Sequence, residues 1–320
     1  MLSFKNRGER RNAMKVYRSA YAKTNADSAV ALGCFDGVHI GHTQIIKATS
    51  EEAKKSRLCS VVWSFQAPPK SFFSKEPAII TPLPQKRRII KDLGADMLIS
   101  TQFNEKIASL SPEKFFEDIL IGCLRAKHIF CGFNYRFGKG GKGDVGLLYE
   151  LCEKFDIKFT VFEEIKLDGI SVSSSAIRSY LLSGDVESAQ KMLGRPYGLK
   201  GKVKDGQHLG RTLGFPTVNQ SVPQNCLPIK NGVYLTKVKF EKKTRYGITN
   251  IGMRPTVNGK ERVAETNIFD FCGDLYGKYV TVEFVKFIRA ETKFSSLDEL
   301  KNQVNEDIQT AKEIIKNNSI

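Results

Sequence analysis

The stretch GCFDGVHIGH, residues 33–42, decides how the first half of the chain folds. It follows SAVALG (28–33), an apolar run typical of a buried strand, and it leads into the amphipathic pattern of residues 43–55. Ligands of an open α/β sheet bind outside the carboxyl ends of its strands, which is where this stretch falls. Its glycines allow the backbone to approach a phosphate, and the following helix start offers unpaired N–H groups to an anion.

Two of the chain's four histidines, His39 and His42, lie in this stretch. Both imidazoles can donate to the phosphates of a nucleotide as charge develops in a transition state. The stretch contains neither a thiol nor a carboxylate placed as a nucleophile for these groups, so it predicts an in-line displacement rather than a covalent step. A histidine in a loop is usually a solvated side chain, but a pair beside glycines at a strand-to-helix turn favours function.

Working outward, strand-like runs alternate with helical patterns from residue 28 to about 180, which predicts a parallel sheet covered by helices on both faces. MKVYRS, from Met14, predicts a short edge strand. The expected strands are 28–33, 58–65, 95–101, 127–133 and 157–162, and the expected helices are 43–55, 82–94, 111–124 (with Ser111 as its cap) and 144–155.

After about residue 195 the pattern changes to short alternating strands separated by Gly, Asn and Lys turns, which predicts an antiparallel β-barrel. The expected strands include LKGKV, 232–240, 244–252, 262–271 and 278–290. A long helix over 295–316, capped by Ser295 or Ser296, closes the chain with an apolar stripe of Leu297, Leu300, Val304 and Ile308. The predicted domains are a basic extension (1–13), an α/β domain (14–185) and a barrel domain (186–320).

Composition narrows the functional classes. The net charge is +16, of which +6 comes from residues 1–23, where seven Lys or Arg accompany one Glu. The remaining charge is interleaved with acids and forms no aromatic-lined basic track, so nucleic acid is not an expected partner. No apolar run is long enough to span a bilayer, and no secretion signal is evident. Seven cysteines without a C-x-x-C pair favour reduced thiols in the cytoplasm, with neither zinc nor disulfides.

The motif G-x-F-D-G-x-H-x-G-H resembles the signature of nucleotidyltransferases, which transfer AMP from ATP and release pyrophosphate. The resemblance implies an ATP site, with His39 and His42 catalytic. A second element of that group, a Ser-rich loop ending in a basic residue, is matched by SVSSSAIRS (171–179). The ATP-binding residues so implied are Gly33, Phe35, Asp36, Gly37, His39, Gly41 and His42 from the first motif, and Ser174, Ser175 and Arg178 from the second, which would hold the pyrophosphate.

The whole chain, from residue 14 to about 316, resembles the bacterial bifunctional riboflavin kinase/FMN adenylyltransferases, also called FAD synthetases. CGFNYRFGKGGKGD (131–144) is similar to the family's Gly-x-Asn-Phe-Arg-Phe-Gly segment, which implies flavin binding by Asn134 and Arg136. The resemblance implies phosphorylation of riboflavin to FMN by the second domain and adenylyl transfer to FMN by the first. Its partners would be riboflavin, FMN and ATP, and we expect a monomer or weak self-association.

The second domain carries the kinase elements of that family. GRTLGFPTVN (210–219) resembles its Pro-Thr-x-Asn element, and E-T-x-x-x-D-F within residues 261–284 resembles another. The resemblance implies ATP binding by Gly210, Arg211, Gly214, Pro216, Thr217 and Asn219. The oxygens of Thr217 and Asn219 would hold Mg²⁺, and Glu265 would be the general base. Without the resemblance, PTVN is equally a Pro-led turn, and a Glu in a strand is more often an exposed ladder residue.

The first domain departs from the family pattern in three places. Phe65-Gln66-Ala67-Pro68-Pro69 lacks the histidine of Phe-x-Pro-His-Pro, residues 173–178 read SSSAIR in place of SSTRIR, and Cys34 stands where Asn is common. These departures leave three alternatives open. They are an enzyme with kinase activity alone, a flavin-dependent oxidoreductase and a nucleic-acid-binding regulator whose affinity would fall steeply with salt.

Overall fold

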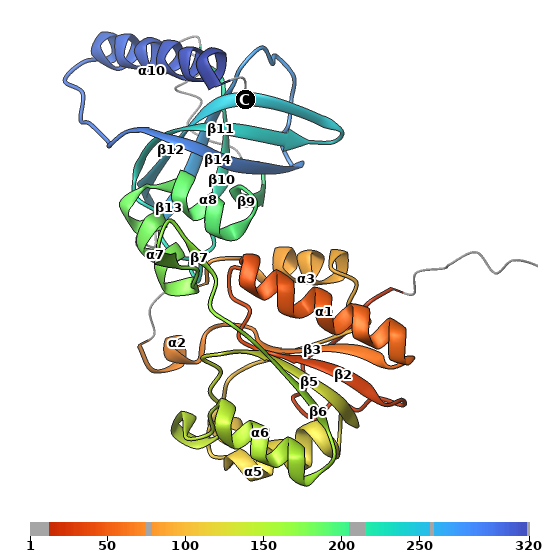
Figure 1. Cartoon of the computed structure of the whole chain (residues 1–320). Helices are drawn as coiled ribbons and strands as arrows, with labels where there is room; N and C mark the ends of the chain where they lie inside the picture. The colour runs from red at the N-terminus through yellow and green to blue at the C-terminus, as the bar shows by residue number, and fades with distance from the viewer. Residues whose placement is uncertain (1–12, 75–78, 205–214, 257–258, 319–320) are drawn as a thin grey trace, which may run out of the picture. The chain divides into compact units, whose positions relative to one another are not determined.

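The computed structural model describes residues 13–74, 79–204, 215–256 and 259–318. The chain divides after Val172 into two compact units, each built on a six-stranded sheet (Figure 1). The predicted fold class, a parallel α/β domain followed by a curled antiparallel sheet and a terminal helix, is confirmed. The predicted boundary between residues 185 and 186 stays a prediction, because compactness does not say which activity residues 173–185 serve. Residues 1–12 of the predicted extension lie outside the described residues.

The first unit contains a parallel sheet in the order β1-β4-β3-β2-β5-β6. From β2 the chain winds first through β3 and β4 on one side, and then through β5 and β6 on the other. The reversal at β2 creates a topological switch point, where such sheets bind ligands. The strands are β1 (Lys15–Tyr17), β2 (Ser28–Leu32), β3 (Cys59–Phe65), β4 (Met97–Thr101), β5 (Ala126–Gly132) and β6 (Lys158–Phe162).

Helices cover both faces of this sheet (Figure 1). The side chains of β2 alternate between two apolar clusters, as strand geometry requires. Ala29 and Ala31 pack with α1 (Ile40–Ser56) and α3 (Leu83–Asp92), while Val30 and Leu32 pack with the opposite helices. Those are η1 (Phe115–Ile121), which follows the short α5 (Pro112–Lys114), and α6 (Val145–Lys154). Shorter elements are α2 (Pro69–Ser74), α4 (Glu105–Ala108), η2 (Lys139–Gly141), β7 (Lys166–Leu167) and β8 (Ile170–Ser171).

The helix predicted over residues 111–124 begins as expected and then differs. Ser111 caps it, since its hydroxyl accepts the backbone N–H of Lys114 at 3.2 Å. After one α-helical turn the chain becomes a π-helix, in which the N–H of Gly122 bonds the carbonyl of Glu117, five residues back, at 2.8 Å. A single-sequence pattern does not separate this wider turn from an α-helix, because the same residues remain on the buried face.

The second unit is an antiparallel sheet in the order β10-β13-β12-β11-β14-β9. It curls so that its two end strands approach each other. Residue Lys204, just after β9, forms a backbone bridge with Asn219 on β10, with N–H to carbonyl distance 2.9 Å. The strands are β9 (Tyr197–Lys202), β10 (Thr217–Ser221), β11 (Gly232–Phe240), β12 (Lys243–Thr256), β13 (Gly259–Ile268) and β14 (Tyr279–Arg289).

Two helices precede this sheet, α7 (Ser174–Ser183) and α8 (Val186–Leu193). Both pack within the second unit: α7 accepts a backbone hydrogen bond at the carbonyl of Leu181 from the N–H of Lys230, at 3.1 Å. The apolar residues of α8, from Val186 to Leu193, are buried on one face. The segment predicted only as an interdomain join is therefore helical.

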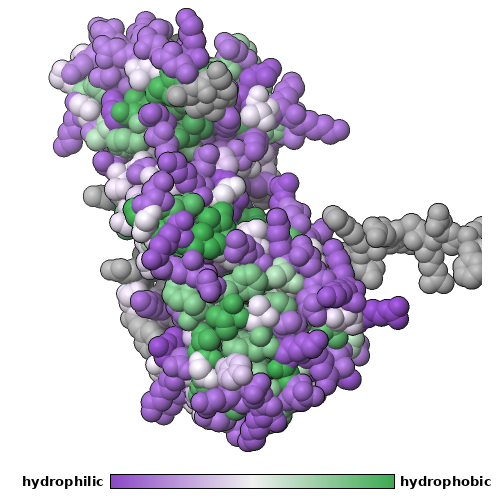
Figure 2. All heavy atoms as spheres, viewed as in Figure 1, coloured by the Kyte–Doolittle hydropathy of each residue, from purple (hydrophilic) through white to green (hydrophobic). Residues whose placement is uncertain are grey.

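The terminal helix α10 (Leu297–Asn318) covers one face of the curled sheet. Ser296 is its cap, because its hydroxyl accepts the N–H of Glu299 at 3.1 Å. Val304 and Ile308 pack on the core around Leu235, as predicted, but Leu297 is 58% exposed, so its place in the stripe was wrong. The first turn extends beyond the sheet, and the buried stripe continues toward the C-terminus instead. The outer surface of α10 is mostly hydrophilic in Figure 2, as expected of an amphipathic helix.

Candidate active sites

The GCFDGVHIGH stretch lies at the carboxyl end of β2, at the switch point of the first sheet. Its backbone is unusual: Phe35, Gly37 and Val38 have φ of 48°, 82° and 43°, in the left-handed region. Non-glycine residues occupy this region at an energetic cost, and such conformations cluster at functional sites. Glycine is also required at Gly33, where an added Cβ would come within 2.8 Å of the Phe35 ring. The loop is therefore tightly folded over its own phenylalanine.

The two histidines lie against each other at the start of α1. Their rings stack with centroids 3.5 Å apart and an interplanar angle of 19°. His39 is the N-cap, and its Nδ1 accepts the backbone N–H of His42 at 3.3 Å. A neutral ring that accepts at Nδ1 has its proton on Nε2, which makes Nε2 a donor. The helix begins at Ile40, three residues earlier than predicted, because this cap brings the whole histidine pair into the helix start.

Two other residues of the motif keep this pair in place. The edge of Phe35 meets His42 with ring centroids 5.1 Å apart at 80°. A Cβ at Gly41 would come within 3.3 Å of the His39 ring, so glycine leaves room for the stack.

Asp36 is buried and anchors the loop. Its carboxylate accepts the backbone N–H groups of Ile80, at 3.1 and 3.2 Å, and of Thr81, at 3.4 Å. The structure thus gives Asp36 a role in holding the motif to the segment before α3. Direct contact between Asp36 and ATP, implied by the resemblance, stays a prediction.

Lys86 of α3 lies beneath the loop and was missed from the sequence. Its side chain is buried, and Nζ donates to the Cys34 carbonyl at 2.6 Å, the Ser64 hydroxyl at 2.7 Å and the Phe65 carbonyl at 2.8 Å. Burial lowers the pKa of the Lys86 ammonium, and the carboxylate of Asp36 acts in the opposite direction. In the sequence Lys86 is one of three consecutive basic residues of an amphipathic helix, and nothing there distinguishes it from its neighbours.

Asn134 and Arg136 follow β5, the strand next to β2 in the sheet. Both are exposed, and Arg136 forms an ion pair with Asp144 at 3.3 Å. The structure places them at the same edge of the sheet as the histidine motif, as adjacent parallel strands require. Flavin binding by these two residues stays a prediction.

The predicted Ser-rich loop is a helix start. Ser173 caps α7, with its hydroxyl accepting the N–H of Ala176 at 3.1 Å, and Ser174, Ser175 and Arg178 lie in the first turns of that helix. The chain's compact units place α7 in the second unit. A loop was the wrong prediction because the serine run supplies its own cap.

The kinase motif residues meet on three neighbouring strands of the second unit. Asn219 on β10 is paired in register with Glu265 on β13, and Asn250 on β12 flanks Glu265 from the other side. Thr217 is paired with Asn267, whose side-chain amide donates to the carbonyl of Pro216 at 3.0 Å. The predicted base and the predicted metal ligands therefore share one face. Gly210, Arg211 and Gly214 lie outside the described residues.

Arg254 on β12 joins this group and was also missed. Its Nη2 donates to Oδ1 of Asn219 at 2.8 Å and forms an ion pair with Oε1 of Glu265. The segment NIGMRPTVNG was recognised in the sequence, but register alone brings its arginine to residues 11 and 35 positions away.

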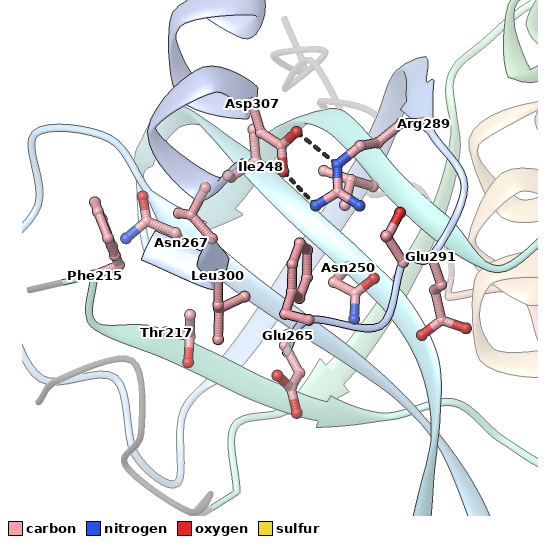
Figure 3. A pocket seen from close by; sticks show the side chains of 14 residues that line it. Phe215, Thr217, Ile248, Asn250, Glu265, Asn267, Arg289, Glu291, Leu300 and Asp307 are labelled. Atoms are coloured by element: carbon pink, nitrogen blue, oxygen red, sulfur yellow. Dashed lines mark hydrogen bonds and ion pairs between the residues drawn. The ribbon is translucent and has the colours of Figure 1, made fainter. Parts of the chain in front are cut away.

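A cavity of about 220 Å³ opens beside Glu265 (Figure 3). Figure 3 shows the oxygens of Glu265 and Thr217 at one side of it, and α10 at the other. Its apolar lining comes from Phe215, Val233, Ile248, Phe294, Leu300 and Val304. A second cavity, of about 300 Å³, lies beside the segment 271–276, and Thr217 lines both cavities. The arrangement suits two substrates that meet at Thr217.

The terminal helix is fastened across the first cavity by an ion pair. Arg289, at the end of β14, donates from Nε and Nη2 to the two carboxylate oxygens of Asp307 on α10, each at 2.7 Å (Figure 3). Asp307 is buried, so a bidentate pair of this kind fixes the position of the helix more firmly than an exposed pair would.

Comparisons with known proteins cover both units. The FAD synthetase family matches residues 21–176, and the riboflavin kinase family matches residues 193–315. Curated proteins named bifunctional riboflavin kinase/FMN adenylyltransferase are similar along the whole length. That of Escherichia coli (strain K12) is 36% identical, covering 94% of this chain and 97% of its own, and that of Bacillus subtilis is 38% identical, covering 89% and 92%. The chain belongs to this family.

A solved structure agrees with the fold of both units. It comes from Streptococcus pneumoniae, is titled a macrolide-efflux protein and is 32% identical, with a TM-score of 0.82 and coverage of 94% of this chain and 99% of that one. Its title names a different activity from the bifunctional relatives. Within the ranges that the structure describes for this chain, no helix is both long and apolar enough to cross a membrane.

Proposed function

We propose that the chain makes FAD from riboflavin in two ATP-dependent steps, one in each half. The second unit is the riboflavin kinase, and the first carries the FMN adenylyltransferase. The observation that best supports the proposal is that the motif residues of each half converge: the stacked histidines at the switch point, and Asn219 opposite Glu265 beside the apolar cavity.

In the kinase half, riboflavin enters the cavity under α10 and ATP enters the one beside residues 271–276. The 5′-hydroxyl oxygen attacks the γ-phosphorus, the bond to the β–γ bridging oxygen breaks and ADP leaves. Glu265 takes the hydroxyl proton. Thr217, which lines both cavities, lies where the two substrates meet.

Thr217 and Asn219 fit a magnesium ion. Their hydroxyl and carboxamide oxygens are hard neutral donors, and Oδ1 of Asn219 already accepts from a cationic guanidinium. When bound with ATP, Mg²⁺ neutralises charge on the phosphates. The backbone glycines of residues 210–214 add phosphate contacts in this proposal.

In the adenylyltransferase half, a phosphate oxygen of FMN attacks the α-phosphorus of a second ATP, and the α–β bridge breaks to release pyrophosphate. His39 donates from Nε2, and His42 beside it donates to the same phosphates. The N-terminal N–H groups of α1 bind the anion. Ser174, Ser175 and Arg178 hold the pyrophosphate, while Asn134 and Arg136 contact the flavin.

The setting follows from the composition. Reduced cysteines suit the cytoplasm, and the interleaved surface charge suits anionic small molecules rather than nucleic acid or a membrane. We propose that the enzyme works as a monomer or in weak self-association.

The experiment is a chromatographic product assay with Mg·ATP, run from riboflavin and from FMN. We expect the wild type to make FMN in the first case and FAD in both. The double variant His39→Ala/His42→Ala should lose FAD formation by at least about 100-fold while keeping FMN formation. Glu265→Gln should lose FMN formation by about 100-fold or more while keeping FAD formation from FMN. Equal loss of both activities in either variant would refute the division of labour, and FMN without FAD from the wild type would leave the kinase alone.

A further inference from the structure

Arg254 holds the two kinase residues that the proposed function assigns to different tasks. Its guanidinium contacts Oδ1 of Asn219, a proposed metal ligand, and Oε1 of Glu265, the proposed base. The three residues lie on three adjacent strands, so the contact depends on the register of the whole face. The arginine and the glutamate are both partly buried, with 23% and 35% of their side chains exposed.

The charges around this group give the arginine no competing carboxylate of equal closeness. Glu261, paired with Arg254 in register, acts on the arginine only through space, and its own ion pair is with Lys204 at 3.5 Å. The guanidinium is therefore committed to Asn219 and Glu265 in the free enzyme.

We infer that Arg254 is the resident cation of the kinase site, which the incoming metal displaces; this inference rests on the proposed function. Oxygen ligands are what a hard divalent cation requires. The Asn219 oxygen cannot donate its lone pairs fully to a metal while it accepts from a guanidinium at 2.8 Å. Two cations within a few ångströms also repel each other. The metal and the arginine therefore compete for this position.

The displacement has a functional consequence. While the guanidinium holds Oε1 of Glu265, that oxygen is not available to the riboflavin hydroxyl. Arrival of the metal–nucleotide releases both the oxygen and the arginine, and the freed guanidinium lies beside the anionic phosphates, which it can bind. The base is thus exposed only after the phosphoryl donor has arrived.

The test is a Mn²⁺ titration of the full chain without nucleotide, followed by electron paramagnetic resonance. Asn219→Ala defines which part of the binding belongs to the barrel. In Arg254→Met, which removes the competing charge and keeps the length of the side chain, we expect Mn²⁺ to bind this site about 10-fold more tightly. Arg254→Lys, which keeps a charge, should stay closer to the wild type. Arg245→Met is the matched control, since Arg245 is an exposed arginine on the same strand, and it should leave the affinity unchanged.

Unchanged or weaker Mn²⁺ binding in Arg254→Met would overturn the inference, because an arginine with only a structural role has no reason to oppose the metal. A tightening of equal size in Arg245→Met would also overturn it, as an effect of net charge. FAD formation from FMN confirms that each variant is folded. Full kinase activity of Glu265→Gln would instead contradict the proposed function, whatever the titration gives.

Discussion

Replacing Lys86 with methionine should weaken the first unit and its activity while sparing the kinase. Lys86 makes three hydrogen bonds, of 2.6, 2.7 and 2.8 Å, to the ends of β2 and β3 under the histidine loop. Methionine fills most of the same volume but donates nothing, so the change isolates the polar contribution of the ammonium.

The magnitude follows from what each acceptor keeps. The hydroxyl of Ser64 still donates to the Cys34 carbonyl at 2.7 Å. The Phe65 carbonyl is then left with a 3.3 Å contact to that same hydroxyl, whose single proton cannot serve both. Losing charged hydrogen bonds costs about 1.5–3 kcal/mol each, and release of the buried ammonium offsets part of this. We expect the free energy of unfolding to fall by about 2–4 kcal/mol, or roughly 5–15 °C in the melting temperature of this unit.

The assay compares melting temperature, FAD formation from FMN and FMN formation from riboflavin. Because the strained loop loses its support, we expect FAD formation to fall about 10- to 100-fold, with FMN formation close to that of the wild type. Lys91→Met is the control, since Lys91 is exposed on the same helix. A Lys86→Met enzyme that melts with the wild type and makes FAD at its rate would refute this reasoning. So would equal loss of the two activities.

Two further predictions concern other parts of the chain. Asp307→Asn should loosen α10 by weakening the bidentate pair with Arg289 and raise the KM for riboflavin about 10-fold or more, with FAD formation from FMN unchanged; the exposed neighbour Glu306→Gln is the control, and an unchanged KM would contradict the role. Burial lowers the pKa of His128 despite the nearby carboxylate of Glu52, so the unfolded chain binds its proton first as the pH falls below about 6.5 and the native state loses stability. His128→Gln should therefore flatten the fall in unfolding free energy between about pH 6.5 and 5, measured by urea titration; a parallel fall in both proteins would count against it.

Much of the first site could be predicted because its chemistry is local. The histidine motif lies within ten residues, and a strand followed by an amphipathic helix fixes its place at the sheet edge. The stacking of His39 on His42 follows from their spacing of three at a helix start. Lys86 was not predictable, because its three acceptors come from two strands whose ends meet only in the folded sheet.

In the second unit, strand positions were predicted well but their register was not. Alternation identifies β11 to the residue and β14 to within one, yet it says nothing about which residues of separate strands stand opposite each other. The contact of Arg254 with Asn219 and Glu265 depends on that register. The serine run at 173–175 was taken for a loop because its capping hydroxyls favour helix starts and turns alike.

The strand that carries Asn219 also closes the curled sheet, and this has a thermal consequence. On one side β10 has a full ladder with β13; on the other, among the described residues, it has the backbone bridge to Lys204 and the side-chain amide of Gln220, which donates to the carbonyls of Gly201 and Val280. Opening this junction breaks far fewer hydrogen bonds than separating any other neighbouring pair in the sheet. On warming, amide protons at the junction should exchange with solvent before those of β11 and β12. The proposed metal ligand thus lies on the part of the barrel that yields first, so metal-bound nucleotide should slow that exchange more than any other in the unit.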